Sequence, residues 1–483
     1  MTCRSAVRAI AAAFALVAAV LTMAPAVGAT YPYANTRPES IKAKPLSFAP
    51  PEPYRTTLPN GMVVYALEDH QLPLVEITAY IKVGSIYDPA DKAGLAEMTG
   101  SLMRTGGTLT KTGDEIDEQL EYIAASVEVS IGQEYGTASL SVLKQDLDQG
   151  LAIFADVLMH PAFREDKVEL ARQQILEEIR RRNDDPPSLA DREFMRLVYG
   201  PDSPWARIPM PATIKSITRQ DLLDLHARYF VPNHIILAAS GDFSRADLIR
   251  KLQALFGAWP RQSTPLPQIP DPPASFRPGV YLIPKSVPQS VVEMGHFGIK
   301  RMSPDQYAVQ VMDFILGASG FTSRLMSQVR TARGLAYEVY AVVSPNADGG
   351  LFRAVALTKA STTAEADRLM VKILHQMQTQ PPTDAEMQVA KDSLINSFVF
   401  EYDTPEKLVS QRALREMLGY PPDYLKSYPA NIRKVTKAEV VEAARKYLHP
   451  DRMVQLIVGD KAQLEGQLAT LGSVTTVTPA PVE

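Results

Sequence analysis

The hydrophobic positions along the chain switch between the two-residue repeat of a strand and the 3.6-residue repeat of a helix. Residues 57–67 contain Pro59-Asn60-Gly61, a hairpin signal, and residues 75–83 alternate apolar and polar side chains as a half-buried strand does. The elements predicted after them are a helix from about Ala93, a helix from Asp114, strands at 126–131 and 136–142, and helices at 146–158 and 165–182. Strands paired by hairpins, with helices gathered to one side, predict an α+β fold.

The same pattern occurs twice along the chain. Residues 217–221 and 435–439 are both helix starts with a capping Thr and an acid three residues later, and they lie 218 positions apart. A proline with Gly-Asp nine residues later recurs at the same offset. A Val-Glu pair, Val75-Glu76 and Val292-Glu293, recurs within one position of it. Three matches in one register predict two homologous halves.

Composition marks the segments around these halves. Residues 1–29 have the basic, apolar and small-residue parts of a secretory signal, and residues 30–53 are rich in proline and polar side chains. Residues 259–279 are too rich in proline for a helix or an interior strand. The predicted order is a signal peptide at 1–29, an extended arm at 30–53, an N-terminal half at 54–258, a linker at 259–279, a C-terminal half at 280–471 and a disordered tail at 472–483.

Composition also excludes several classes of function. The 483 residues are 46% hydrophobic and 22% charged, as in a globular chain with more than one core. A formal net charge of -4 gives no basic patch for nucleic acid or for a membrane surface. The single cysteine, Cys3, lies inside the signal, so we expect no disulfide. With a signal and no later apolar stretch long enough to cross a bilayer, we expect a secreted, periplasmic protein without a membrane anchor.

Ser323–Val343 (SRLMSQVRTARGLAYEVYAVV) changes period in its middle. Ser323 is placed to cap a short helix, Gly334 to end it, and an alternating strand follows. Arg333 at the turn and Tyr340 seven residues later are suited to gripping a peptide, because a guanidinium binds carbonyls and carboxylates while a phenol both donates and accepts. On spacing alone, an ordinary helix-end arginine and an ordinary strand tyrosine are the favoured interpretation.

The run S-R-L-x(4)-R-x(2)-R-G-L-A-Y-x-V-Y in this segment resembles the C-terminal-half signature of the insulinase/mitochondrial processing peptidase (pitrilysin-type) zinc metallopeptidases. The resemblance covers roughly residues 54–471 and implies two halves, each an antiparallel β-sheet with helices packed on it. In that family an Arg and a Tyr seven residues later bind the substrate backbone, which implies this role for Arg333 and Tyr340. Gly317-Ala318-Ser319-Gly320 resembles the family's flexible glycine-rich substrate segment, and a simple helix C-cap and turn is an equally good interpretation.

Active members of the family carry H-x-x-E-H on the first helix of the N-terminal half, where two imidazoles bind zinc and the Glu activates water. In the matching run, Gly94-Leu95-Ala96-Glu97-Met98-Thr99-Gly100-Ser101, Glu97 and Ser101 stand in place of the histidines and Gly100 in place of the general base. The resemblance puts the third ligand at Glu177, 76 residues after Ser101. We expect Glu177 to be a solvated or salt-bridged relic, because with Glu97 it gives an all-oxygen pair with too few ligands for calcium or magnesium.

No other residues replace the lost chemistry. No two of the 7 histidines are spaced as metal ligands on one helix, the mature chain has no cysteine, and no Ser lies in a G-x-S-x-G elbow. We therefore expect no catalytic residue, no metal and no cofactor in this chain.

A substrate-binding half that is intact beside a metal half that is empty implies a partner with the opposite pattern. We expect the non-catalytic, substrate-binding subunit of a heterodimeric exported zinc peptidase, with zinc held by a homologous H-x-x-E-H subunit and with peptides as substrates. The alternative is a peptide-binding or assembly scaffold of the cell envelope, against which Arg333 and Tyr340 argue mildly. A self-sufficient hydrolase that uses Glu97 and Glu177 is the least favoured interpretation.

Overall fold

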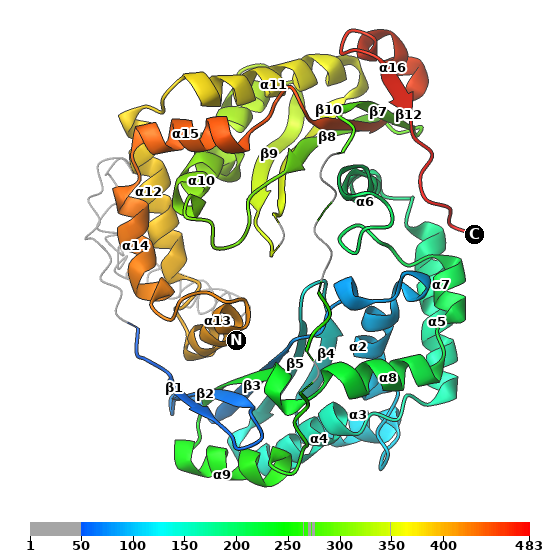
Figure 1. Cartoon of the computed structure of the whole chain (residues 1–483), viewed down its shortest axis with the longest axis vertical. Helices are drawn as coiled ribbons and strands as arrows, with labels where there is room; N and C mark the ends of the chain where they lie inside the picture. The colour runs from blue at the N-terminus through cyan, green and yellow to red at the C-terminus, as the bar shows by residue number, and fades with distance from the viewer. Residues whose placement is uncertain (1–49, 264, 269–271, 273–275, 348) are drawn as a thin grey trace, which may run out of the picture. The chain divides into compact units, whose positions relative to one another are not determined.

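In the computed structural model, each half of the chain builds one six-stranded sheet, and the strand orders of the two sheets correspond (Figure 1). The structure describes residues 50–483, apart from 264, 269–271, 273–275 and 348. The predicted signal peptide and residues 30–49 of the predicted arm lie outside the described residues. Among the described residues, no helix combines the length and the apolar character that a membrane span requires.

The strand order shows the repeat directly. The N-terminal sheet runs β1 (Tyr54–Thr57), β2 (Val63–Glu68), β6 (Ile235–Gly241), β3 (Leu74–Ile81), β5 (Gly136–Leu143) and β4 (Ser126–Ile131). The C-terminal sheet runs β12 (Val474–Thr476), β7 (Gly279–Pro284), β11 (Val454–Gly459), β8 (Gln289–Phe297), β10 (Leu351–Lys359) and β9 (Ala336–Ser344). The prediction of an α+β fold in two homologous halves is confirmed.

The sheets are mixed, where the sequence predicted antiparallel ones. Within each half the last long strand inserts between two earlier strands, β6 between β2 and β3 and β11 between β7 and β8, and it pairs parallel with one of them, β2 or β7. β12 is also parallel to β7. Such a parallel pair needs a long crossover, here most of the half, so no short-range turn signal announces it.

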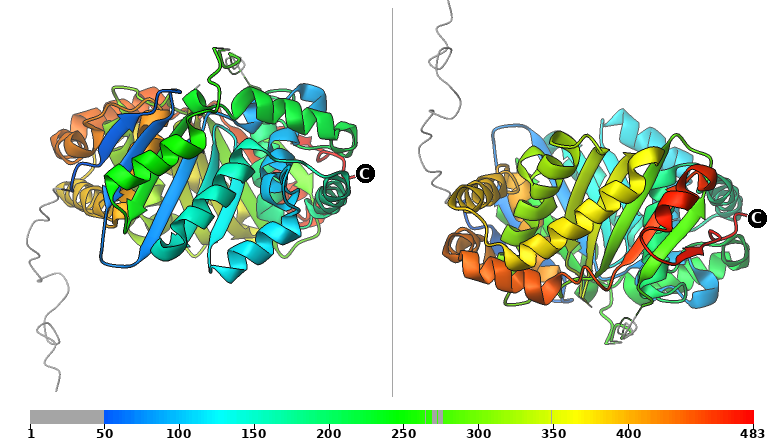
Figure 2. Two further views of the ribbon diagram at one scale, coloured as in Figure 1. Left: turned by 90° about the horizontal axis from the view of Figure 1, so that it is seen from below. Right: turned by 90° about the horizontal axis from the view of Figure 1, so that it is seen from above.

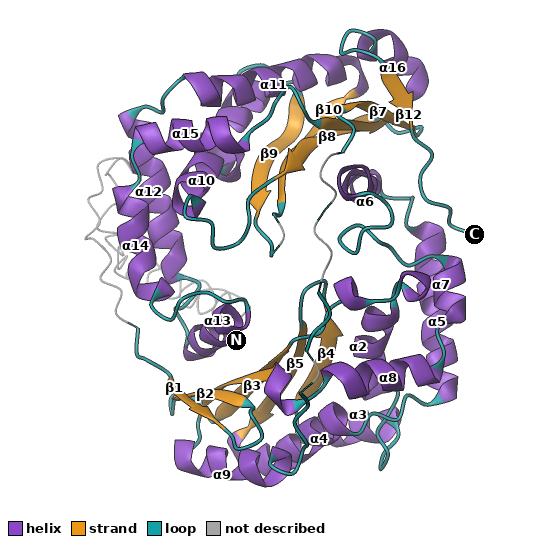
Figure 3. Cartoon of the chain, viewed as in Figure 1, coloured by secondary structure: helices purple, strands orange, loops and turns teal. Residues whose placement is uncertain are grey.

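Helices cover one face of each sheet (Figures 2 and 3). In the N-terminal half α4 packs on β5, α9 on β2 and α2 on β4, and in the C-terminal half α10 packs on β9 and α11 on β10. The N-terminal helices are α2 (Leu95–Thr105), α3 (Gly113–Tyr122), α4 (Leu147–Met159), α5 (Glu165–Arg181), α6 (Pro186–Tyr199), α7 (Pro211–Ser216), α8 (Arg219–Tyr229) and α9 (Arg245–Phe256). The C-terminal helices are α10 (Gln306–Asp313), α11 (Thr363–Thr379), α12 (Asp384–Val399), α13 (Pro405–Met417), α14 (Tyr424–Lys434), α15 (Lys437–Tyr447) and α16 (Lys461–Leu468).

The opposite face of each sheet is covered by a helix from the other half. α6, from the N-terminal half, packs on β8 and β11, and α13, from the C-terminal half, packs on β2, β3 and β6. Buried Phe194 and Val198 of α6 share a core with the C-terminal sheet, and Val409 and Ala413 of α13 share one with the N-terminal sheet. Each half therefore buries apolar surface that the other half supplies, which favours folding of the pair together over folding of either alone.

The tail at 472–483 is not disordered as predicted. β12 adds to the free edge of the C-terminal sheet beside β7, and beyond it the backbone N–H of Ala480 donates to buried Glu193 of α6 at 3.1 Å. The guanidinium of Arg182 also donates to the carbonyl of Pro481. A strand edge and a buried carboxylate that needs donors hold this polar segment, and neither is visible in its own composition. The described residues of the predicted linker, up to Pro278, form neither helix nor strand.

Candidate functional site

The degenerate zinc motif lies on α2, and hydrogen bonds to the side chain of Asp88 hold the N-terminus of this helix. The buried carboxylate of Asp88 accepts hydrogen bonds from the backbone N–H groups of Gly94 and Ala96, each at 3.0 Å. Burial raises the pKa of Asp88 to about 7, although these N–H donors act in the opposite direction. The helix is thus held firmly where its motif begins.

α2 packs directly on β4, and Gly100 lies at the contact. A Cβ on Gly100 would be 2.8 Å from the backbone N of Ile131 and 3.2 Å from the carbonyl carbon of Ser130. Both atoms belong to the backbone of a strand, so they cannot yield as the end of a flexible side chain would. The position that active family members use for the general base therefore has no room for a side chain.

Glu97 and Ser101 are exposed residues of α2. The Oγ of Ser101 donates to the carbonyl oxygen of Met98 at 3.0 Å, within the same helix. Partial desolvation of the carboxyl group, and then the negative charge of Glu178, raise the pKa of Glu97. At the two histidine positions the helix presents one carboxylate and one hydroxyl that is already hydrogen-bonded.

Glu177, predicted at the third ligand position, is engaged on its own helix. Its carboxylate accepts from Arg180 at 3.1 Å and from Arg181 at 2.9 Å, and these hydrogen bonds lower its pKa. The carboxylate that interacts with Glu97 is that of the next residue, Glu178. One position along an α-helix rotates a side chain by about 100°, so Glu177 and Glu178 point in different directions from α5, and the assignment of the third ligand position to Glu177 stays a prediction.

The residues around α2 do not fit zinc. Protein zinc sites take thiolate, imidazole and carboxylate ligands in a tetrahedral set. Glu97, Glu178 and the Ser101 hydroxyl supply neither nitrogen nor sulfur. Over the part of the chain that the structure describes, no group of three or more His, Cys, Asp or Glu side chains is placed to hold a metal ion.

Replacing Glu178 with Gln is expected to stabilise the protein slightly near neutral pH, by less than about 0.5 kcal/mol because the site is exposed. The folded-state pKa of Glu97 is raised, so ionised Glu97 opposes folding at neutral pH and stops doing so once it is protonated. Removing the neighbouring charge relieves that cost. The gain should fade as the pH drops through the folded-state pKa of Glu97 toward 4.5, its ordinary value.

Urea denaturation of the Glu178→Gln variant at neutral and acidic pH measures this effect. Glu177→Gln is the matched control on the adjacent residue, and it should give no gain because it removes two ion-pair contacts. A gain of equal size in both variants would contradict the pairing of Glu97 with Glu178.

The second candidate region is the segment from Phe314 to β9. It contains two π-helical turns, Phe314–Ala318 and Met326–Thr331, and then the strand. Arg333 is exposed after the second turn, and its nearest carboxylate is Glu365, 3.4 Å away. π-turns aim side chains in directions that a regular helix does not allow, and they occur often at functional sites.

Tyr340 lies on β9 in a row with Val355 and Glu293 of the two neighbouring strands. Its partial burial, and then the carboxylates of Glu293 and Glu338, raise its pKa. Among the described residues, no hydrogen bond or ring contact joins Tyr340 to Arg333. The structure therefore gives the two predicted residues separate environments.

A different arginine and tyrosine, also seven residues apart, are in contact. The guanidinium of Arg330 lies 5.6 Å from the ring centre of Tyr337 and 5.0 Å from that of Phe321. The rings of Phe321 and Tyr337 are 72% and 70% exposed. The sequence signature contains both pairs, so spacing alone cannot choose between Arg330/Tyr337 and Arg333/Tyr340.

Two local irregularities create this contact. Arg330 lies in the π-turn Met326–Thr331, and β9 carries a bulge at Tyr337, because Leu357 pairs with Glu338 while Thr358 pairs with Ala336. A bulge adds one residue to a strand and redirects its side chains. The strict alternation predicted from Leu335 onward is therefore wrong at its start, where Ala336 is buried and Tyr337 is exposed.

The predicted glycine-rich segment divides into two parts. Gly317 is buried in a π-turn, and a Cβ there would lie 2.1 Å from the backbone N of Ala341 in β9. Gly320 has a left-handed φ of 58° and nothing near its Cβ direction, and Ser319 accepts a hydrogen bond from the Thr322 hydroxyl at 3.0 Å. Gly317 is thus a packing residue, and only Ser319 and Gly320 belong to an open loop.

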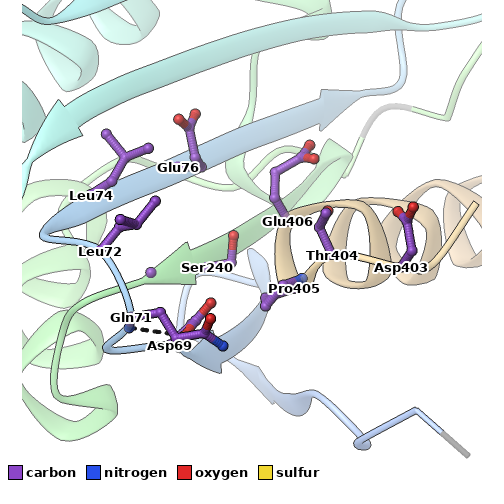
Figure 4. A pocket seen from close by; sticks show the side chains of 11 residues that line it. Asp69, Gln71, Leu72, Leu74, Glu76, Ser240, Asp403, Thr404, Pro405 and Glu406 are labelled. Atoms are coloured by element: carbon purple, nitrogen blue, oxygen red, sulfur yellow. Dashed lines mark hydrogen bonds between the residues drawn. The ribbon is translucent and has the colours of Figure 1, made fainter. Parts of the chain in front are cut away.

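A pocket of about 650 Å³ lies elsewhere, where the start of α13 meets the N-terminal sheet (Figure 4). Carboxylates of Asp69, Glu76, Asp403 and Glu406 line it. Partial burial, and to a smaller extent the charge of Glu406, raise the pKa of Glu76. None of the candidate residues on α2 or β9 takes part. The pocket belongs to the junction between α13 and the sheet.

Comparisons with known proteins point to one family of peptidases. A model of the insulinase family (peptidase family M16) matches residues 63–199, and a model of the peptidase M16 inactive domain matches residues 216–394. A protein of Mycobacterium tuberculosis described as an uncharacterized zinc protease is 27% identical over 400 residues, which cover 82% of this chain and 91% of that protein. One of Streptomyces coelicolor with the same description is 26% identical over 404 residues, with 82% and 87% covered.

Two solved structures share the fold of both halves. A peptidase M16 inactive domain from Pseudomonas fluorescens aligns with a TM-score of 0.78 at 26% identity, covering 85% of this chain and 98% of that one. A protease from Helicobacter pylori aligns with a TM-score of 0.77 at 20% identity, covering 85% and 100%. The first family model contains α2, and the second contains Arg330 and Tyr337.

Proposed function

Because the chain belongs to the insulinase family of peptidases (peptidase family M16), we propose that it is the non-catalytic, substrate-binding subunit of an exported heterodimeric zinc peptidase. The observation that carries the proposal is the contact of Gly100 with β4, which leaves no space for a general base. With no nitrogen or sulfur donor at the two histidine positions either, this chain supplies neither the metal nor the base. Both must come from a homologous H-x-x-E-H subunit.

The part left to this chain is to bind and orient the peptide. We assign that part to Arg330 and Tyr337, which are in contact, in preference to Arg333 and Tyr340. Tyr337 is exposed and Arg330 is half-buried. The guanidinium of Arg330 donates to peptide carbonyl oxygens, and the Tyr337 hydroxyl can donate or accept beside it. Donors held in place before the substrate arrives lower the barrier by positioning and by stabilising developing charge.

Export follows from the signal-like residues 1–29, and periplasmic location is part of the same proposal. The net charge of -4 agrees with a peptide substrate and gives no support for nucleic acid.

Co-expression with an exported H-x-x-E-H subunit of the same host tests the proposal. We expect the two chains to co-purify in equal amounts and to cleave short peptides in a chelator-sensitive reaction, while this chain alone cleaves none. Stoichiometric zinc and peptidase activity in the isolated chain would refute the proposal. Stable co-purification without activity toward a broad peptide library would favour the envelope scaffold.

A further inference from the structure

We propose that Phe321 is a positioning residue for Arg330, and that it holds the guanidinium ready for the peptide. This inference rests on the proposed substrate-binding function and adds a residue to it. Phe321 lies at the tip of the short turn Gly320–Thr322, and its ring centre is 5.0 Å from the Arg330 guanidinium. With Tyr337 at 5.6 Å, two aromatic rings flank one cation.

Arg330 depends on these rings because no carboxylate of the described residues forms an ion pair with it. The other arginines of the segment are paired, Arg324 with Glu386 through bonds of 2.7 and 3.1 Å, and Arg333 with Glu365 at 3.4 Å. Among the described residues, no carboxylate lies within ion-pair distance of Arg330, and its Nη1 donates a long hydrogen bond to the sulfur of Met326 at 3.9 Å. The two rings are therefore its principal contacts.

Holding a guanidinium by rings has a different consequence from holding it by a carboxylate. A bidentate carboxylate uses two N–H donors and neutralises the charge. An aromatic face attracts the cation through the ring quadrupole and uses none of the donors. Arg330 is thus ordered while most of its N–H donors remain available, which reduces the entropic cost of peptide binding.

The turn that presents Phe321 is fastened at its base. The Oγ of buried Ser323 donates to the carbonyl oxygen of Gly320 at 2.9 Å and accepts from the backbone N–H of Met326 at 3.2 Å. The same serine therefore joins the loop to the π-turn that contains Arg330. Phe321 is therefore held on a fixed turn beside the guanidinium of Arg330, where it can position that group.

The test uses the heterodimer and a quenched-fluorescence peptide. Phe321→Leu keeps an apolar side chain and removes the aromatic face, and it should raise KM with little change in kcat, lowering kcat/KM about two- to fivefold as expected for an exposed cation–π contact. Phe321→Tyr keeps the face and should restore the value. Phe400→Leu, at a second exposed phenylalanine that is 65% exposed, is the matched control and should have no effect.

A double-mutant cycle separates positioning from a merely structural role. In the Arg330→Ala background the effect of Phe321→Leu should disappear, because there is no guanidinium left to position. If Phe321→Leu equals the Phe400→Leu control while Arg330→Ala lowers activity, the role of Phe321 is refuted and the proposed function stands. If Arg330→Ala leaves activity unchanged, the proposed substrate-binding role of Arg330 and this inference are both refuted.

Discussion

Replacing Arg330 with alanine is expected to lower kcat/KM of the heterodimer roughly 10- to 100-fold, the range for a lost hydrogen bond from a charged donor. The reason is local: Arg330 contacts Phe321 and Tyr337 through ring faces and donates otherwise only a long hydrogen bond to the sulfur of Met326, so most of its donors remain for a peptide. Arg330→Lys should recover only part of the loss, because an ammonium lacks the planar fork. Initial rates over a range of peptide concentrations give kcat and KM separately.

The controls are Arg333 and Tyr340, the residues to which the family resemblance assigned substrate binding. Arg333→Ala should change kcat/KM less than about threefold, because Arg333 is exposed and its contact with Glu365 is a surface ion pair. Tyr337→Phe should lower activity more than Tyr340→Phe. A larger loss of kcat/KM in the Arg333 and Tyr340 variants than in the Arg330 and Tyr337 variants would assign substrate binding to Arg333 and Tyr340, the pair first predicted.

The sequence was a good guide wherever a local rule decided the structure. Thr218 and Thr436 form the predicted capping boxes in corresponding helices, and β4 spans the residues predicted for it. The repeat offset foretold equivalent sheets, since each matched element recurs at the same place in the second half. These features depend on neighbours within a few residues, which the chain order itself supplies.

Features set by distant partners were out of reach. The insertion of β6 beside β2 and the exchange of α6 and α13 between halves depend on surfaces more than a hundred residues away in sequence. The tail found its place through a sheet edge and Glu193, which its own composition does not reveal. The positions of these segments are set by contacts with parts of the chain that are distant in sequence.

The two segments of the candidate site were predicted from the sequence, but the sequence did not decide which residues within them are in contact. The matching flanks located α2 and the S-R-L segment, but two pairs share the spacing of seven residues, and only the π-turn and the bulge at Tyr337 distinguish them. The effect of Glu178 on the pKa of Glu97 could not be predicted for a similar reason, because a one-residue difference along α5 changes the helix face. The spacing of residues in the sequence does not reveal a π-turn, a β-bulge or the direction in which a helical side chain points.

Gly100→Ala is expected to destabilise the protein by about 1–3 kcal/mol, the usual cost of overpacking. Within a helix, Gly→Ala normally stabilises by roughly 0.5–1 kcal/mol. Here the new methyl would lie 2.8 Å from the backbone N of Ile131, so the sign should reverse. Gly466→Ala in α16, where a Cβ meets nothing within 4 Å, is the matched control and should be neutral or stabilising. Urea denaturation of both variants measures the difference, and equal stabilisation would disprove the tight contact of α2 with β4.

The same contact decides whether the family's chemistry can be rebuilt in this chain. Restoring the motif as Glu97→His, Gly100→Glu and Ser101→His supplies two imidazoles beside Glu178, and the Glu at position 100 must push α2 off β4 to fit. We therefore expect Glu97→His/Ser101→His, with Gly100 retained, to stay folded and to gain zinc affinity without peptidase activity. The triple variant should lose stability at least as large as that of Gly100→Ala. A stable, zinc-dependent peptidase from the triple variant would mean that α2 and β4 separate easily. The absence of catalysis would then be due to the side chains at positions 97, 100 and 101, and not to the packing of α2 on β4.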